Sequence, residues 1–228
     1  VATALAYRYE NAEWQATIKV ERLLPRMTAQ VLSFVQLQSE SLVSHSEIIV
    51  NVAQARTRQI VFSLPESTPT EVTIRGLGEV VVKETASSVS DGRRIWTVQL
   101  AERQNGTLRL AVDFSERLNT SQSLEIRIPV VRTVDSEYQS GVVAVEGNAE
   151  LEIAITQHPR IVDIGELVDA QYQVGKRLLG VYGYVGIDDN VTASITRIPV
   201  QRLPTTIVQR AEMVSLLSTQ GVIQTAAR

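Results

Sequence analysis

Strict alternation of apolar and polar residues is the feature that most constrains how this chain can fold. From Trp14 to Val20 every second residue is apolar and the residues between are polar, which is the pattern of a strand with one buried face. Most of the similar runs are rich in Val, Ile and Thr, which strands favour. The alternation predicts further strands at Val31–Leu37, Glu47–Val52, Gln59–Leu64, Glu71–Ile74, Glu79–Val82, Arg94–Leu100, Thr107–Phe114 and Leu124–Val131.

Alternation continues in the second half of the chain and stops only between His158 and Tyr172. Gly141–Val145 and Glu150–Ile155 are predicted to form a hairpin that turns at residues 146–148. Over His158–Tyr172 the apolar spacing approaches that of a helix, but the segment is too short to nucleate one alone, so we expect a connector with one helical turn. Two more strands are predicted at Arg177–Val185 and Val191–Ile198.

Turn residues lie between the predicted strands, as a β fold requires. Asp91-Gly92 is the sequence of a two-residue hairpin turn, and Pro65 and Pro69 bracket another break. Glycines are also expected to mark turns at Gly76, Gly78 and Gly106. Antiparallel strands joined by short loops, with almost no helix between them, predict an all-β antiparallel β-sandwich with long strands and little helix.

Composition excludes several functional classes. Without cysteine the chain has no disulfide, thiolate nucleophile or Cys-ligated zinc, and two histidines are too few for a His-rich metal site. A net charge of -3 argues against nucleic-acid binding. The sequence has no Gly-x-Ser-x-Gly, Walker-type or His-Glu-x-x-His motif, so we predict neither an enzyme nor a cofactor. No apolar run is long enough to span a membrane and no signal peptide is present, so we expect a piece of a longer protein.

An internal repeat is indicated by three short matches that keep their order along the chain. They pair Tyr7-x-Tyr9 with Tyr182-x-Tyr184, Ala16-Thr-Ile18 with Ala193-Ser-Ile195, and Ser41–Ser44 with Ser215–Ser218. The repeat predicts two strands over Thr205–Ala226, where local propensity fits a helix equally well. Residues 1–170 are then expected to form one sandwich unit, and residues 171–228 the opening strands of a second, truncated copy packed on the first. The alternative is one large sandwich over residues 1–228.

Five phrases of the sequence resemble a known kind of protein region. They are Tyr7-x-Tyr9, the alternating Trp14–Val20, Ile60–Pro65, Gly76–Val80 and Gly141–Val145. Together they resemble the β-repeat regions of very large, uncharacterised bacterial envelope proteins. This resemblance implies an extracytoplasmic location, in the periplasm or at the cell surface, with any membrane anchor outside this chain. It also implies the absence of a catalytic activity.

His45 is the first candidate for chemistry. It lies in the sequence Ser44-His-Ser-Glu47, where flanking hydroxyls and a carboxylate are the groups of a proton relay. The repeat places Thr219 opposite His45, and a catalytic base has no reason to be replaced by threonine in the other unit unless only one unit acts. We therefore favour the interpretation of His45 as a polar residue of a strand or turn.

Two further polar groups have a functional and a plainer interpretation. His158, Asp163 and Glu166 on the connector are the residue types of a small metal or acid–base cluster, or else ordinary charges of an exposed loop. Asp188-Asp-Asn190 resembles part of a calcium loop but lacks the spaced carboxylates and the closing Glu, so a simple turn is favoured.

Four tyrosines are the candidate ligand-binding residues, namely Tyr7, Tyr9, Tyr182 and Tyr184. Their spacing puts each pair on one face of a strand, where aromatic rings can stack on sugars. Core packing or a seam between units explains the same spacing with fewer assumptions. The preferred function is a non-catalytic structural or interaction module of a larger extracytoplasmic bacterial protein, with neighbouring repeats, another protein or a glycan as partner. The alternative is a carbohydrate-binding β-sandwich module.

Overall fold

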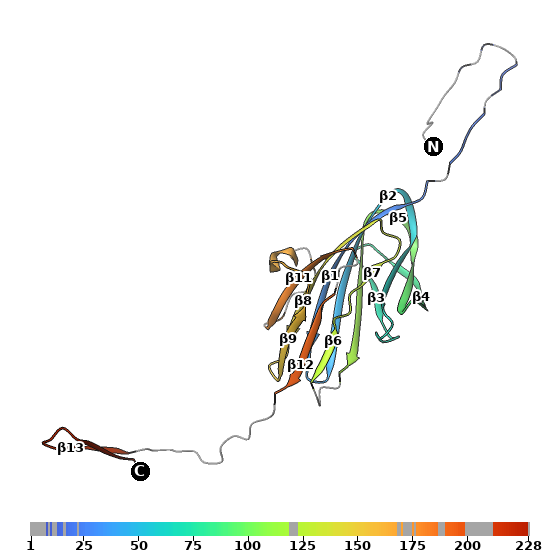
Figure 1. Ribbon diagram of the computed structural model, residues 1–228. Helices are drawn as coiled ribbons and strands as arrows, with labels where there is room; N and C mark the ends of the chain where they lie inside the picture. The colour runs from blue at the N-terminus through green and yellow to red at the C-terminus, as the bar shows by residue number, and fades with distance from the viewer. Residues whose placement is uncertain are drawn as a thin grey trace. The chain divides into compact units, whose positions relative to one another are not determined.

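The computed structural model consists almost entirely of β-strands (Figure 1). It describes all residues except 1–7, 9, 11–12, 16, 22, 119–122, 168–169, 171–174, 176, 187–189, 199–211 and 228. The chain divides into two compact units, residues 1–197 and residues 198–228. The prediction of an all-β, sandwich-like fold with long strands and little helix is confirmed.

The larger of two sheets in the first unit has nine strands. They are β1 (Arg26–Leu37), β2 (Ser41–Pro65), β3 (Thr73–Leu77), β4 (Val82–Ser90), β5 (Arg93–Arg117), β7 (Arg132–Thr133), β8 (Tyr138–Gly147), β10 (Arg160–Ile161) and β11 (Leu178–Val185). The order is β10-β11-β8-β1-β2-β5-β3, with β4 paired to β5 and β7 paired to β2. Among the described strands of this sheet, β1 and β8 form the parallel pair, and the other pairs are antiparallel.

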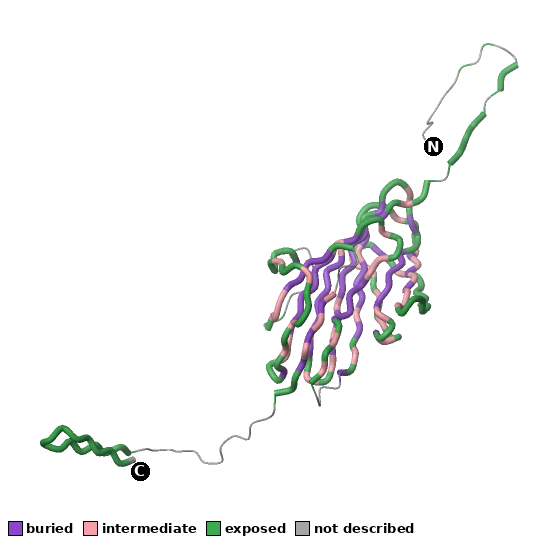
Figure 2. The backbone as a smooth tube through the Cα atoms, in the orientation of Figure 1, coloured by how far each residue is buried: buried purple, intermediate pink, exposed green. Residues whose placement is uncertain are grey.

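A second, three-stranded sheet packs on the larger one. It contains β6 (Leu124–Arg127), β12 (Thr192–Arg197) and β9 (Leu151–Gln157), with β12 in the middle. Side chains of both sheets form one apolar core, in which Val31 and Val143 of the larger sheet meet Leu151 and Ile195 of the smaller. Figure 2 shows the buried residues concentrated along the central strands of the first unit.

Strands β2 and β5 are longer than the alternation predicts, because each joins two predicted strands into one. Gly106, expected at a turn, lies inside β5 with φ of 81°, and Gln54 of β2 has φ of 66°. The pairing register between β2 and β5 shifts between Val52 and Thr57, which is the signature of a β-bulge. A bulge bends a strand pair without ending it, and both halves of β2 bury their inward side chains in the same core.

Three predicted strands do not match the structure. The described residues of Trp14–Val20 form no strand, because none of the described strands pairs with them. Residues 78–79 form a turn, so the strand predicted at Glu79–Val82 is wrong and β4 begins only at Val82. The strand predicted at Leu124–Val131 ends early, at Arg127, since Pro129 has no N–H to donate to a strand ladder.

The hairpin predicted to turn at residues 146–148 is also wrong. Both of its strands exist, as β8 and β9, but β8 pairs with β1 and β11 in the larger sheet, whereas β9 pairs with β12 in the smaller. The turn therefore carries the chain from one sheet to the other. Alternation identifies a strand with one buried face but does not identify its hydrogen-bonding neighbour.

Several turn and connector predictions are confirmed. Asp91 and Gly92 join β4 to β5 with φ of 52° and 68°, the left-handed conformations that a tight hairpin turn of this kind requires. The connector after His158 contains one short 3₁₀ helix, η1 (Ile164–Leu167). In the second unit, β13 (Met213–Leu217) and β14 (Ile223–Ala227) form the two strands expected there, while residues 205–211 lie outside the described residues. The division of the chain at residue 170 and the packing of a truncated copy stay predictions.

Candidate functional site

Charged residues gather on the outer face of the larger sheet, the face turned away from the smaller sheet. We call His45 and Glu47 of β2, Arg75 of β3, and Arg109 and Asp113 of β5 the polar cluster. Side chains alternate along a strand, so His45 and Glu47 point away from the core that Ser44 and Ile48 enter. The register pairs His45 directly with Asp113, and Asp113 also pairs with Thr73 of β3. Three adjacent strands thus bring these residues together.

Asp113 lies at the centre of the polar cluster. Its Oδ1 is 2.5 Å from Nδ1 of His45, and its Oδ2 accepts a hydrogen bond of 2.8 Å from Nη2 of Arg75. Burial alone would raise the pKa of the Asp113 carboxyl, but the hydrogen bonds and charges of His45 and Arg75 outweigh it, so this pKa lies below its ordinary value of 3.8. Asp113 is therefore held in its ionised form.

Glu47 is the buried member of the polar cluster. Its side chain has no exposed surface, and its carboxylate oxygens lie 3.7 Å from Nε2 of His45 and 3.6 Å from Nη2 of Arg109. A carboxylate removed from water without a compensating charge costs several kcal/mol, on the order of the penalties measured for broken buried ion pairs. The flanking cation of Arg109 supplies that compensation, which ties the position of Glu47 to β5.

An apolar cluster and a groove adjoin the polar cluster on the same face. Leu32 and Phe34 of β1 pack there with Val181 of β11, and Leu167 of η1 covers them. The ring of Phe34 lies 6.1 Å from that of His45, centroid to centroid. Beside this pair is a groove of about 930 Å³, whose lining includes Phe34, His45, Asp113 and Glu71.

The His45 ring lies between two carboxylates of the polar cluster. One imidazole nitrogen of His45 contacts Asp113 and the other lies near Glu47, so both nitrogens face carboxylates of the protein. The flanking serines point into the sandwich, where Ser46 Oγ hydrogen-bonds to Ser33 Oγ at 3.0 Å. The flanking hydroxyls therefore do not face the His45 ring, and His45 itself lies in strand β2, where it pairs with Asp113.

Sequence reasoning identified the Glu47 carboxylate near His45 but missed the members of the polar cluster on other strands. Asp113 occupies a polar position of an alternating strand, where an exposed charge is the ordinary expectation. Only the cross-strand register brings Asp113 against His45, and the sequence carries no direct signal of that register.

The connector residues proposed as a cluster are not brought together. His158 stacks on the ring of Tyr182, with 4.9 Å between centroids, and its Nδ1 lies 2.6 Å from the carbonyl oxygen of Pro159. Asp163 accepts a hydrogen bond from the backbone N–H of Gly165, which fixes the start of η1. No hydrogen bond or ion pair among the described residues joins these side chains to Glu166. The exposed-loop interpretation therefore accounts for them.

Part of the segment Asp188-Asp-Asn190, for which a simple turn is favoured over a calcium loop, lies outside the described residues, namely Asp188 and Asp189. The neighbouring Asn190 donates a hydrogen bond of 2.8 Å to Oε1 of Gln157, at the end of β9. Within the described part of the chain, no group of three or more His, Asp and Glu side chains is arranged to hold a metal ion.

The tyrosine pairs divide between the core and the residues that are not described. Tyr7 and Tyr9 lie outside the described residues. Tyr182 and Tyr184 are 5% and 4% exposed and belong to the core between the sheets, which confirms core packing for this pair. Burial raises the pKa of the Tyr182 hydroxyl above its ordinary value. The sugar-stacking role stays a prediction, and this burial argues against it.

Tyr184 is held on both sides. Its hydroxyl accepts a hydrogen bond of 3.4 Å from Nε2 of Gln139, and its ring lies over Gly141, the residue opposite it on β8. Tyr184 also takes part in the lining of a groove of about 540 Å³, together with Tyr138 and Arg160. Of the two tyrosines, Tyr138 is the exposed one.

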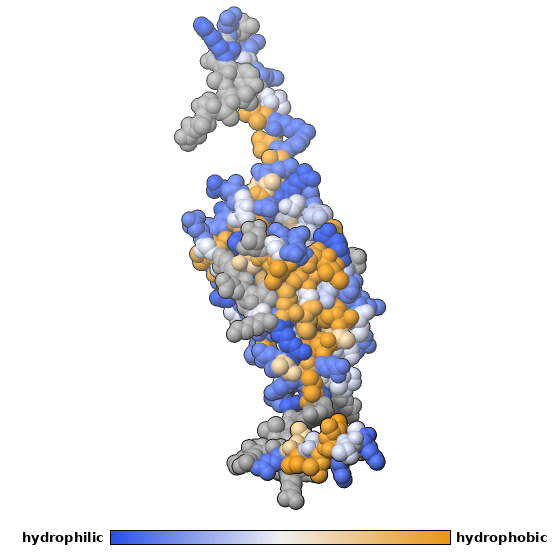
Figure 3. All heavy atoms as spheres, turned by 90° about the vertical axis from the view of Figure 1, so that its left-hand side faces the viewer, coloured by the Kyte–Doolittle hydropathy of each residue, from blue (hydrophilic) through white to orange (hydrophobic). Residues whose placement is uncertain are grey.

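Two apolar segments outside the sandwich are exposed, and both are candidate interaction surfaces. The N-terminal segment, residues 14–20, exposes Trp14, Ile18 and Val20. The C-terminal hairpin, β13 with β14, exposes apolar side chains along β13 on both of its faces. Figure 3 shows hydrophobic residues at the surface of the C-terminal hairpin.

No protein-family model matches this chain, and no curated protein matches it. None of the helical segments in the described residues has the length and apolar character needed to span a membrane. A functional assignment therefore rests on the geometry of the described residues.

Proposed function

We propose that this chain is a non-catalytic structural or interaction module of a larger extracytoplasmic bacterial protein, and that neighbouring sandwich units of the same protein are its partners. The observation that carries the proposal is the C-terminal hairpin. Its strand β13 has the sequence Met-Val-Ser-Leu-Leu, and every residue of β13 is exposed. A two-stranded hairpin is only marginally stable in water by itself, so these apolar side chains need a protein surface to cover them.

The polar cluster supports the non-catalytic part of the proposal. A general base needs a ring nitrogen within hydrogen-bond reach of the substrate proton. In His45 both nitrogens face carboxylates of the protein. The cluster thus links β2, β3 and β5 across the outer face of the sheet, which is a structural role.

Photo-crosslinking in the intact parent protein tests the interaction. A photoreactive amino acid replaces Leu216 on the exposed hairpin, and a matched control replaces Asp91 on the exposed β4–β5 turn. Mass spectrometry is expected to find Leu216 crosslinked to β-rich segments of the same polypeptide, and few products from Asp91. Equal, unspecific crosslinking from the two positions would contradict the proposal.

Three further measurements test the location and separate the alternatives. Protease added to cells with a permeabilised outer membrane is expected to digest the chain while a cytosolic marker survives; equal protection of both would exclude an extracytoplasmic site. Calorimetry with cell-wall polysaccharides is expected to give no saturable heat. Saturable binding that is lost in Tyr138→Ala would favour the carbohydrate-binding module, and turnover abolished by His45→Ala in a hydrolase screen would favour an enzyme.

A further inference from the structure

The N-terminal segment and the strand β12 carry matching sequences in opposite environments. The sequence from residue 14 is Trp-Gln-Ala-Thr-Ile, and that from residue 191 is Val-Thr-Ala-Ser-Ile. The first, third and fifth residues are apolar in both, and the third and fifth are identical. The fourth residue is a small hydroxyl residue in both. The two segments therefore present the same inward and outward faces when they are strands.

The apolar face is fully buried at β12. Val191, Ala193 and Ile195 have no exposed surface. The strand lies between β6 and β9 and pairs with both, with Ile195 opposite Leu124 on one side and opposite Ile153 on the other. The small Ala193 likewise lies opposite Ile126 of β6 and Ile155 of β9, so the position has a defined shape as well as an apolar character.

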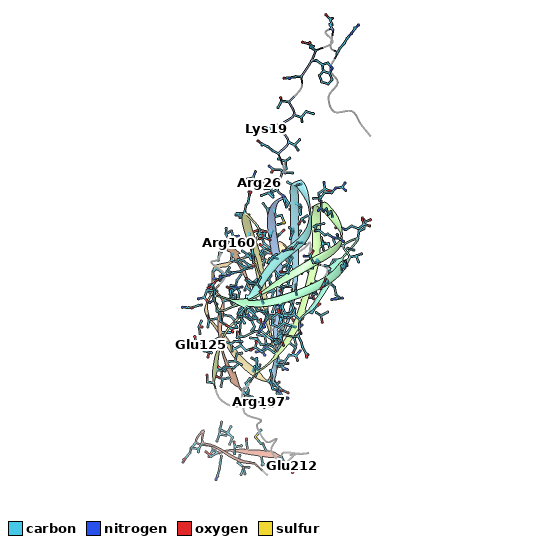
Figure 4. The ribbon with its side chains drawn as sticks, turned by 90° about the vertical axis from the view of Figure 1, so that its right-hand side faces the viewer. Lys19, Arg26, Glu125, Arg160, Arg197 and Glu212 are labelled. Atoms are coloured by element: carbon cyan, nitrogen blue, oxygen red, sulfur yellow. The ribbon has the colours of Figure 1, made fainter. Side chains whose placement is uncertain are left out.

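The same face is exposed in the N-terminal segment. Ile18, the counterpart of Ile195, has 82% of its surface exposed, and Trp14 has 58%. None of the strand pairs formed by the described residues includes this segment. Figure 2 draws its described residues as exposed, and Figure 4 shows Lys19, which lies on its polar face, and Arg197 at the end of β12.

The residues on either side of the two segments match in the same order. Tyr7-x-Tyr9 precedes the N-terminal segment as Tyr182-x-Tyr184 precedes β12, and both tyrosines of the second pair lie in the core. Leu24-Pro25 follows the first segment as Leu203-Pro204 follows the second. The correspondence therefore extends from the tyrosine pair before each segment to the Leu-Pro pair after it, rather than over five residues alone.

We infer that residues 14–20 are a β12-type strand for a second sandwich unit of this fold. In that unit the segment lies between the equivalents of β6 and β9, with Ala16 and Ile18 in the positions of Ala193 and Ile195. Gln15, Thr17 and Lys19 then face outward. This inference rests on the proposed function and deepens it, because it names the partner as a sandwich whose β12 position is open.

Peptide complementation of the full chain tests the inference. In Ile195→Asp a buried apolar side chain becomes a charge, which weakens the hold of β12 on its position. A synthetic peptide of residues 10–25 is then expected to bind this variant and to raise its thermal unfolding midpoint with peptide concentration, as ligands of the folded state do. The control peptide carries Ile18→Asp and is expected to have no effect. The wild-type chain, whose own β12 fills the position, is expected to bind neither peptide.

The outcomes decide the inference whether or not the variant folds alone. If Ile195→Asp does not fold, it is refolded with each peptide, and the milder Ile195→Ala is tested in parallel. Recovery of folded chain only with the wild-type peptide supports the inference. No binding to either variant, or equal effects of the two peptides, overturns it. The crosslinking from Leu216 tests the other end of the chain. A failure of peptide binding would therefore overturn this inference without overturning the proposed function, and a failure of the crosslinking would overturn the proposed function without deciding the peptide experiment.

Discussion

Ile18 and Ile195, the two isoleucines that match in the predicted repeat, give the sharpest prediction about stability. Ile195→Ala removes three carbon atoms from a side chain without exposed surface, packed between Leu124 and Ile153 of the flanking strands. At about 0.8 kcal/mol for each buried carbon, plus the cavity that remains, the free energy of unfolding should fall by about 2 to 5 kcal/mol. Ile18→Ala makes the identical chemical change at a residue that is 82% exposed. It should change the free energy of unfolding by no more than about 0.5 kcal/mol.

Urea unfolding at equilibrium measures both variants. The buried Trp96 supplies a fluorescence signal from the core, and far-ultraviolet circular dichroism follows the strands in parallel. The slope of free energy against urea should stay constant, so that the midpoint alone moves. Equal losses for the two variants would refute the reasoning, because they would show the N-terminal segment to be as well packed as β12.

Three further predictions concern the core, the unit boundary and the polar cluster. A Cβ on Gly141 would lie 2.2 Å from Cζ of Tyr184, so Gly141→Ala should lower the free energy of unfolding by about 1 to 3 kcal/mol in the same urea assay. A chain ending at Gly175 loses β11 and β12 and should be insoluble, whereas one ending at Arg197 should unfold cooperatively at the midpoint of the full chain, as seen by circular dichroism. Burial alone would raise the pKa of Asp113, but His45 and Arg75 lower it below its ordinary value of 3.8. The lowered pKa increases the free energy of unfolding above pH 3.8, and this increase is lost as the pH falls through the pKa of Asp113 in the folded state. Asp113→Asn should therefore flatten the acid side of the profile of unfolding midpoint against pH.

Local pattern predicts which residues form strands better than it predicts where the strands lie. Alternation and β-branched composition locate β1, β8 and β11, and Asp91-Gly92 locates a turn, because these properties depend on neighbouring residues alone. The same alternation occurs at Trp14–Val20, where the described residues form no strand. A strand also needs a partner for its backbone groups, and that partner is a property of the tertiary structure.

The polar cluster could not be predicted for a related reason. His45 and Asp113 are far apart in the sequence and meet because β2 and β5 pair in one register. A shift by one residue would turn Asp113 into the core and remove the contact. The register of these long strands also depends on the bulge near Gln54, which no residue of the sequence indicates. Gly106 indicates only a turn, although it lies inside β5.

The C-terminal hairpin shows which of the sequence matches behind the predicted repeat agree with the strands of residues 198–228. The match of Ser41–Ser44 with Ser215–Ser218 would place the hairpin turn, residues 218–222, on residues 44–48. In the first unit those residues lie inside the continuous strand β2, so this match conflicts with the structure. The turn of the β1–β2 hairpin lies at residues 38–40 instead.

A second sequence match places β13 on β1 rather than on β2. Met213–Leu217 matches Val31–Val35, because both runs are apolar except for a serine in the third position, and this match sets the hairpin turn at residues 218–222 on residues 36–40, which contain the β1–β2 turn. In the first unit Val31–Val35 is buried on both faces, since β1 lies between β2 and β8 with an apolar cluster on each side of the sheet. A continuous apolar run is the pattern of such a central strand. If β13 is the first strand of a second sandwich unit, as the predicted repeat requires, its exposure on both faces is what such a strand shows before its neighbours pair with it and cover it.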